Sequence, residues 1–234
     1  MIKIKMKKIL ANLKDNYLLE LFFIMINLLS SSILRLMTIK NISRISALLI
    51  DLSFLIIVTV LSFKIKPKNK IKYFMALSVV FSLICIINSV YYHYYNSFAS
   101  VSLLSLTGFA ADVSDAIFEN VLKIKDLIYI LNPILLYIFY KYLKDKKSYF
   151  KGKNKKTSFK YPLILSLALS IIGALTMPLS SWSRLYKLWN RESVVMNFGI
   201  YVYQVDDLIQ SVRPQINSLF GHDSSLKEVK EYYE

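Results

Sequence analysis

The lysine-rich stretch Lys141–Lys160 constrains the fold of this chain more than any other feature of its sequence. It holds nine lysines, one acidic residue and one glycine, and a long apolar run lies on each side of it. Lysine and arginine close to the end of a membrane span resist translocation, so a short loop of this kind is typical of the cytoplasmic side. The stretch therefore assigns a side of the membrane to every other segment.

The composition favours a membrane protein over a soluble one. The 234 residues are 55% hydrophobic, and their mean hydropathy is +0.44. The net charge of +15 raises the alternative of a nucleic-acid partner. However, nineteen of the thirty basic residues lie in three blocks that alternate with apolar runs, namely Met1–Asp15, Lys64–Lys72 and Lys141–Lys160. This distribution is typical of topology signals, so we expect a lipid bilayer as the partner and no nucleic acid.

The apolar runs predict an all-α membrane protein with five transmembrane helices. The predicted spans are residues 17–37, 46–63, 71–92, 127–143 and 161–182. The predicted inner segments hold nineteen basic residues and two acids, whereas the outer segments hold ten and eleven. We therefore expect the N-terminus inside and the C-terminus outside. Residues 1–182 form the predicted membrane domain, and residues 183–234 form an extracellular juxtamembrane helical linker.

Amphipathic helices are predicted on the outer side, in addition to the spans. One follows the third span, where apolar and charged residues between Asp112 and Lys123 fall on opposite helical faces. A second lies in the linker, where an apolar stripe runs from Val194 to Val212 at helical spacing. We expect Pro214 to end that helix and the adjacent Asp206 and Asp207 to lie on its solvated face.

Two charged residues fall at similar depth within the predicted spans. Arg35 lies near the outer end of the first span, and Asp51 lies about a turn and a half below the outer surface in the second. A charge inside a bilayer is costly and usually finds a partner. A structural ion pair and an Arg35 side chain that extends outward to water are the favoured interpretations. Contact between Arg35 and a lipid headgroup is the functional alternative.

The sequence shows no catalytic or metal-binding pattern. His93 and His222 are far apart, Cys85 is the only cysteine, and the five glycines form no phosphate-binding loop. We therefore predict no catalytic residue, no metal site and no cofactor in this chain. The side chains predicted to face the outer surface and contact lipid headgroups are Arg35, Tyr92, His93, Trp182, Arg184 and Arg191.

Two outer stretches carry recognisable motifs. Asn88–Ile130 contains a Gly-x-x-x-Asp-Val-x-Asp run from Gly108 to Asp115, and Asp126 opens the fourth span. The second stretch, Asn190–Ser211, has its motif residues at Asn197, Phe198, Gly199, Tyr203 and Asp206 or Asp207. Together with the spans and the lysine loop, these stretches resemble the N-terminal membrane half of the lipoteichoic acid synthase family.

The resemblance implies a multi-pass protein of a bacterial plasma membrane that works with an extracellular sulfatase-like domain. In that family, a threonine nucleophile and a divalent metal, usually manganese, transfer glycerol phosphate from phosphatidylglycerol to a growing teichoic acid. We expect that domain to be missing from this chain, and manganese to belong to it. The chain would then anchor and position a separate sulfatase-like catalytic domain or other cell-envelope enzymes.

Two other functions compete with this one. A non-catalytic scaffold or truncated relic associated with cell-envelope synthesis is the main alternative. A small transporter is disfavoured, because transporters usually contain repeats and polar sites at the membrane midplane, and the sequence shows no internal repeat.

Overall fold

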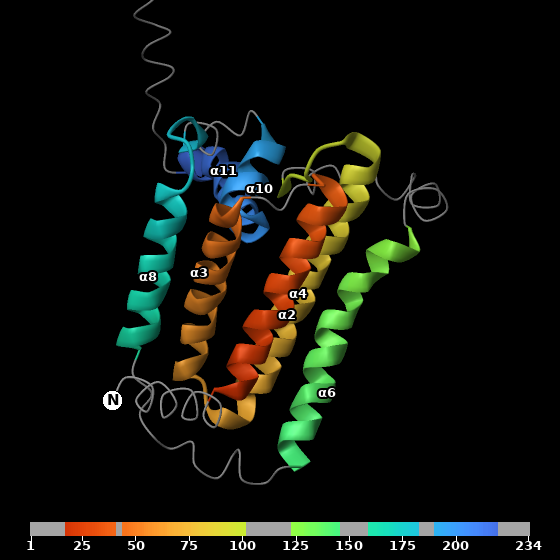
Figure 1. Cartoon of the computed structure of the whole chain (residues 1–234), viewed down its shortest axis with the longest axis vertical. Coiled ribbons are helices and arrows are strands. Elements are labelled where there is room, and N and C mark those ends of the chain that lie inside the picture. Colours follow the sequence, from red (N-terminus) through yellow and green to blue (C-terminus); the bar gives the residue numbers. More distant parts are fainter. Residues whose placement is uncertain (1–16, 41–43, 102–122, 146–158, 183–189, 220–234) are drawn as a thin grey trace, which may run out of the picture.

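The computed structural model describes residues 17–40, 44–101, 123–145, 159–182 and 190–219. Within these residues every regular element is a helix and no strand occurs. Figure 1 shows most of the helices side by side, with α10 and α11 across one end. We call this the capped end of the bundle, and the other the opposite end. The all-helical prediction is confirmed for the described part of the chain.

The helices follow one another in a simple order. Those that lie side by side are α2 (Leu18–Thr38), α3 (Ile45–Leu61), α4 (Pro67–Tyr95), α6 (Leu131–Asp145) and α8 (Lys160–Leu175). The 3-10 helix η1 (Ser62–Lys64) extends α3, and the 3-10 helix η4 (Ile124–Ile130) leads into α6. The capping helices are α10 (Arg191–Phe198) and α11 (Ile200–Leu219). The predicted helix between Asp112 and Lys123, the N-terminal basic segment and the end of the linker lie outside the described residues.

Four helical segments are long and apolar enough to cross a membrane. They are Leu18–Thr38, Ile45–Lys64, Asn69–Tyr95 and Ile124–Lys144, and they overlap the first four predicted spans. The fifth predicted span contains α8, whose 16 residues extend only about 24 Å at 1.5 Å per residue. A proline disfavours the helical conformation of the residue before it. Pro178 lies three residues beyond the end of α8. The count of five spans and their orientation therefore remain predictions.

Helix boundaries follow from local chemistry. Pro67 occupies the first turn of α4, where its missing N–H costs nothing. Asn96 ends the same helix in the left-handed conformation, with φ 49°. The fourth span changes from a 3-10 to an α-helix at Leu131, and Pro133 falls in the first turn of α6. Pro214 does not end α11, which continues to Leu219, so that prediction is wrong.

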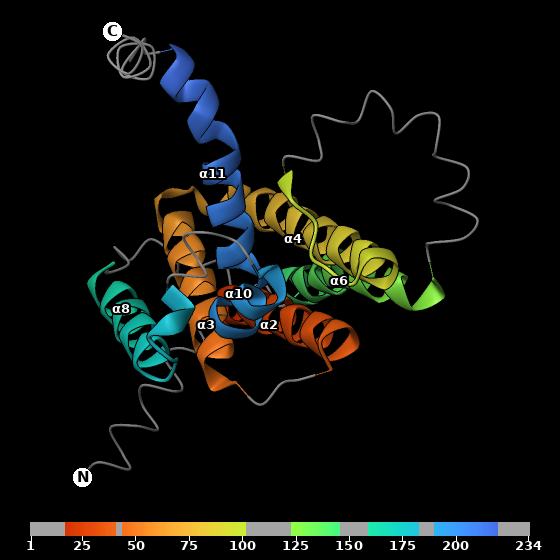
Figure 2. The same ribbon diagram turned by 90° about the horizontal axis from the view of Figure 1, so that it is seen from above.

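Helix α2 is at the centre of the bundle and packs against α3, α4 and α6. Aromatic contacts join it to its neighbours. Phe23 contacts Phe74 of α4 with ring centroids 4.7 Å apart, and Phe22 stacks on Phe139 of α6 at 4.0 Å. Such pairs add to the energy of packing itself, which matters between helices surrounded by lipid. Figure 2 shows α8 at the edge of the bundle, beside α3.

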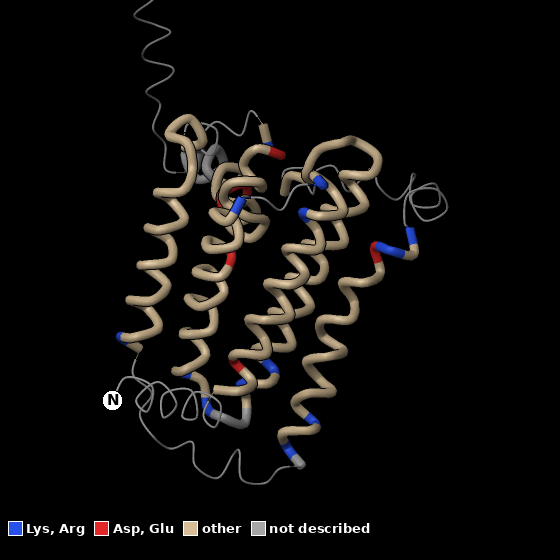
Figure 3. The backbone as a smooth tube through the Cα atoms, viewed as in Figure 1, with Lys and Arg blue, Asp and Glu red and all other residues tan. Residues whose placement is uncertain are grey.

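A buried ion pair closes the opposite end. Lys70 of α4 lies 2.8 Å from Glu20 of α2, and the two side chains are only 11% and 3% exposed. The Lys70 ammonium also lies over the Phe63 ring, 5.2 Å from its centroid. Most of the charged residues drawn at this end in Figure 3 are basic. Glu20 is thus a buried partner of Lys70.

Small residues let α8 approach α3 closely. The Ser53 hydroxyl of α3 donates to the Ser166 carbonyl at 2.8 Å and lies 2.6 Å from the Ser170 hydroxyl. One turn further along, a Cβ on Gly173 would come within 2.8 Å of Ile50. The two helices therefore depend on serine and glycine at their contact, as is common between membrane helices.

We expect Gly173→Leu to destabilise the bundle, because its side chain must displace Ile50 at the α3–α8 contact. Overpacking of this kind costs about 1–3 kcal/mol. The matched control is Ala168→Leu, at an exposed position of the same helix. Thermal unfolding in detergent measures the difference. Equal midpoints for the two variants would show that α8 does not pack on α3 as described.

Candidate functional site

Buried polar side chains gather at the capped end of the bundle, where α10 and α11 meet the spans. They form three clusters, which centre on Asp51 of α3, Asp207 of α11 and Asp126 of η4. The first joins α11 to α2 and α3. The second holds the segment that follows α4, and the third joins α4 to η4.

The carboxyl group of Asp51 caps the beginning of α11. Asp51 is fully buried, and its Oδ1 accepts a hydrogen bond from the Tyr201 amide at 3.4 Å. The Ile200 amide is also directed at this carboxyl group, whereas Oδ2 has no hydrogen-bond partner. The first N–H groups of a helix lack partners within it and carry positive partial charge, so an acidic side chain there is stabilising. Asp51 supplies this cap from a different helix, 150 residues earlier in the sequence.

Gly199 makes the close approach possible. It separates α10 from α11 and has φ 82° and ψ 170°, a region that side chains other than glycine rarely adopt. A Cβ at this position would lie 2.2 Å from Asp51 Oδ1. Both the backbone conformation and the space therefore require glycine here.

Tyr201 inserts the first turn of α11 into the bundle. Its hydroxyl donates to the Asn27 carbonyl of α2 at 2.8 Å. Its ring stacks on Phe54 of α3 at 5.8 Å and contacts Phe81 of α4 at 4.7 Å. The side chain of Tyr201 therefore contacts three helices of the bundle, α2, α3 and α4.

Arg35 lies buried beside this cluster, with 1% of its surface exposed. Its guanidinium donates to the Ser31 carbonyl at 3.5 Å and to the Ser32 hydroxyl at 3.4 Å. Arg35 and Asp51 attract each other electrostatically, but no direct ion pair joins them in the described structure. Contact between Arg35 and a lipid headgroup would require this end of the bundle to open.

The segment that follows α4, residues 98–101, is held between the spans and the linker. We call it the strap. The Asn88 side chain accepts from the Ala99 amide at 3.0 Å, and Tyr203 of α11 donates to the Ala99 carbonyl at 3.0 Å. Arg191 of α10 donates to the Phe98 carbonyl at 3.2 Å. Burial raises the pKa of the Tyr203 hydroxyl, so it stays a donor at neutral pH.

Asp207 fixes the strap from the other side of α11. It is 2% exposed, and it accepts hydrogen bonds from the Ser100 hydroxyl at 2.7 Å and from the Val101 amide. The prediction of a solvated face is therefore wrong for Asp207, because the strap covers it. Asp206 points elsewhere and accepts from Gln210 at 2.7 Å. Partial burial raises the pKa of Asp206, the charge of Asp207 raises it further, and the Gln210 bond lowers it.

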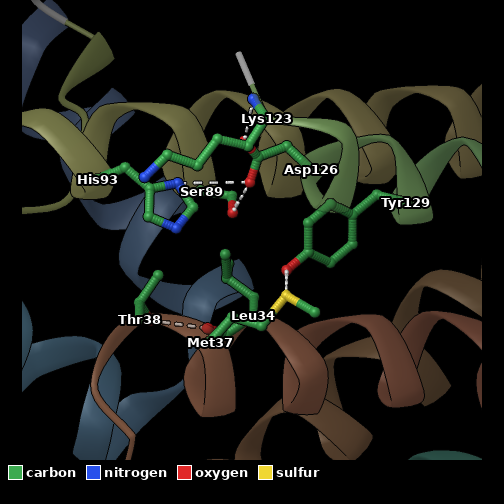
Figure 4. Close-up of polar contacts among 8 residues, drawn as sticks. All are labelled: Leu34, Met37, Thr38, Ser89, His93, Lys123, Asp126 and Tyr129. Atoms are coloured by element: carbon green, nitrogen blue, oxygen red, sulfur yellow. Dashed lines mark hydrogen bonds and ion pairs between the residues drawn. The ribbon is translucent and has the colours of Figure 1, made fainter. Parts of the chain in front are cut away.

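The third cluster is drawn in Figure 4. Asp126 is fully buried and accepts from the Ser89 hydroxyl at 2.6 Å and from the Lys123 amide at 3.0 Å. His93 Nδ1 lies 3.4 Å from Asp126 Oδ1, and neither ring nitrogen has a hydrogen-bond partner. Below them, the Tyr129 hydroxyl lies 3.8 Å from the Met37 sulfur and joins η4 to α2. No group of three metal-binding side chains occurs among the residues that the structure describes.

The side chains predicted to contact headgroups do not form one site. Tyr92 and Arg191 meet at Phe98, which the Tyr92 ring contacts at 5.1 Å. His93 belongs to the Asp126 cluster. Trp182 is half exposed and meets the Phe198 ring edge-on at 5.4 Å. Arg184 lies outside the described residues, and headgroup contact remains a prediction for the whole set.

The residues that join the linker to the bundle were not predicted from the sequence. Tyr201 and Asn88 had no predicted role, and Gly199 was only part of a motif. A glycine within an amphipathic stretch is a signal for a helix end. That signal predicts the break between α10 and α11 but not the Asp51 partner, because the two are distant in the sequence.

We expect Gly199→Ala to destabilise the protein, because it strains the backbone and displaces Asp51. The backbone strain alone is about 1–3 kcal/mol. In an Asp51→Ala background the displacement disappears, so the same substitution should cost less. Chemical unfolding of the wild type, both single variants and the double variant gives the coupling. Additive losses would mean that Gly199 and Asp51 do not interact.

Asp207→Ala should release the strap, whereas Asp206→Ala should leave it in place. Loss of a hydrogen bond to a charged group is worth about 1.5–3 kcal/mol, which predicts about a tenfold or greater increase in hydrogen exchange. Exchange at the Val101 amide measures this directly. The neighbouring Asp206→Ala variant controls for loss of charge on α11. Equal exchange in the two variants would contradict the assignment.

Comparisons with known proteins agree with this architecture. The profile of the lipoteichoic acid synthase N-terminal domain matches residues 2–219. Neither the curated proteins nor the solved structures gave a match. The match spans nearly the whole chain, including every helix described above. The chain therefore belongs to the family of the lipoteichoic acid synthase N-terminal domain and is a membrane protein.

Proposed function

We propose that the chain is the membrane-embedded part of a glycerophosphotransferase that uses phosphatidylglycerol to build lipoteichoic acid. Its task is to anchor a sulfatase-like catalytic domain and hold it over the membrane. The observation that carries the proposal is the attachment of α10 and α11 to the spans through Asp51, Tyr201 and Asp207. A linker held in this way fixes the position of whatever is joined to it.

The distribution of charge supports an extracellular location for the capped end. Basic residues dominate the opposite end in Figure 3, around η1 and at the end of α6. The described acids other than Glu20 and Asp145 lie toward the capped end. In this proposal the opposite end is cytoplasmic, as the positive-inside rule favours, and the protein crosses the bacterial plasma membrane several times. The linker would then lie on the side where an extracellular catalytic domain works.

Cationic side chains at the capped end suit an anionic lipid. Lys40, Lys123 and Lys125 are exposed there, and Arg44 and Arg191 are partly exposed. Arg44 is positioned by Asn197 of α10, whose side-chain oxygen accepts from it at 2.9 Å. Such residues attract anionic headgroups to the membrane surface. We propose that they, with Tyr92 and Trp182 at the interface, favour phosphatidylglycerol near the catalytic domain.

The chemistry of transfer belongs, in this proposal, to the sulfatase-like domain, with its threonine nucleophile and manganese. The Asp126 cluster has one histidine and one carboxylate in contact, which is fewer than the three or four ligands that a metal site needs. In this proposal the present residues position the catalytic domain and attract the lipid substrate.

Complementation tests the proposal. The chain is expressed in cells that lack their own synthase, alone and together with a separate sulfatase-like domain, and polyglycerolphosphate is detected by blotting. We expect polymer only when both pieces are present. A covalently joined version of the two pieces is the positive control. Gly199→Ala should reduce the polymer, and Ala168→Leu, on the exposed face of α8, should not.

Other outcomes point to other functions. If the joined control makes polymer and the separate pieces do not, the chain acts only when covalently attached to its catalytic domain, or it is a scaffold or relic. Polymer from the chain alone would contradict the division of labour proposed here.

A further inference from the structure

Helix α11 carries an exposed apolar stripe beyond its first turn. The stripe consists of Val205, Leu208, Ile209 and Val212, which are 41%, 47%, 59% and 36% exposed. These positions share one face of a helix, because the last three lie three, four and seven residues after the first. We call them the α11 stripe. Four neighbouring exposed apolar side chains on one helix indicate a contact with lipid or with another protein surface, which would shield them from water.

The direction of the stripe follows from Tyr201. Tyr201 lies one turn before Val205 on the same face of α11, and its side chain points into the bundle, where it donates to the Asn27 carbonyl. The stripe therefore continues from a residue packed among the membrane helices. It is directed toward the interior of the membrane and not away from it.

Contacts on the opposite side of α11 fix its rotation about the helix axis. Tyr203 and Asp207 lie on that side and bind the strap at Ala99 and Ser100. Asp206 and Gln210, also away from the stripe, bind each other at 2.7 Å. With Tyr201 held on one face and the strap on the other, the rotation of α11 about its axis is fixed.

Figures 1 and 2 show how the helix is placed. Seen from the side, α11 lies across the capped end; seen from above, its distal half projects beyond the outline of the bundle. The helices of the bundle end below α11, and its distal part extends past them. Lipid that surrounds the bundle would lie under this projecting part.

We propose that α11 is an interfacial helix and that its stripe rests on the acyl chains of the adjacent membrane leaflet. An amphipathic helix of this kind lies in the plane of the membrane with its apolar face at the boundary between headgroups and acyl chains. The stripe supplies the apolar face, and the side chains of Asp206 and Gln210 face the aqueous side. Lipid is favoured over a second copy of the chain, because the stripe follows a side chain that packs among the membrane helices and lies on the same side of α11. The inference holds on whichever side of the membrane the capped end lies, so it does not depend on the proposed function.

The test uses the full chain in nanodiscs of phosphatidylglycerol and phosphatidylcholine. Single cysteines replace Leu208, Ile209 or, as the matched control on the polar side, Gln210, and an environment-sensitive fluorophore labels them. Cys85 is fully buried, and the unsubstituted chain verifies that it does not react. Phosphatidylcholine with a nitroxide on its acyl chain then quenches probes that contact lipid.

We expect quenching at Leu208 and Ile209 to exceed that at Gln210 by about twofold or more, as for an interfacial helix. Val205→Cys provides a second position nearer the anchored turn if a label at Ile209 disturbs the helix. Equal lipid quenching at all positions would overturn the proposal. So would emission at Leu208 that is shielded from water but insensitive to the lipid nitroxide, because a protein partner would then cover the stripe. Strong quenching of the stripe by a water-soluble quencher would overturn it as well.

Discussion

The arrangement of the capped end depends on one buried carboxyl group. A charged aspartate at the centre of a membrane helix costs about 2.5–3.5 kcal/mol on insertion scales, so a buried acid near the end of a span also needs compensation. The beginning of a helix can return up to about 2 kcal/mol in a partly buried geometry. The α11 cap therefore offsets part of the cost of Asp51, and the nearby Arg35 and Ser31 supply further stabilisation. Asp51 and the linker thus need each other: without α11 the acid has lost its cap, and without Asp51 the first amides of α11 have no partner.

The other contacts define how the linker sits once it is capped. Tyr201 sets the depth of its first turn, because its hydroxyl must reach α2. Asp207 and Tyr203 set the rotation of α11 through the strap, and Arg191 holds α10 against the same segment. Because these contacts come from α2, α3 and the segment after α4, the linker is stable only when those elements are correctly placed. The position of α11 therefore depends on how α2, α3 and the segment after α4 are packed.

Much of the fold could be predicted from the sequence, because hydropathy over about 20 residues is a strong signal. The four longest apolar segments and the helical linker were found in this way. The fifth predicted span, residues 161–182, extends beyond α8, which ends at Leu175, and it remains a prediction. The candidate site was harder to predict. Asp207 has the same chemistry as Asp206 beside it, and only the position of the strap decides which of the two is buried. The sequence indicated that the charge of Asp51 needs a partner inside the membrane. Its partners in α11 are backbone amides, and no sequence pattern identifies them.

The same reasoning separates the two ends of the bundle. At the opposite end, Glu20 and Lys70 neutralise each other directly, and each of them belongs to a span. At the capped end the acids accept hydrogen bonds from hydroxyls and backbone amides, and many of these donors lie in the linker, in the strap or just before η4. An ion pair between two spans needs no other segment of the chain. Acids that accept hydrogen bonds from the linker and the strap lack those donors until these segments dock. The polar residues at the capped end therefore make assembly of the bundle conditional on the linker, which couples the membrane part of the protein to whatever the linker carries.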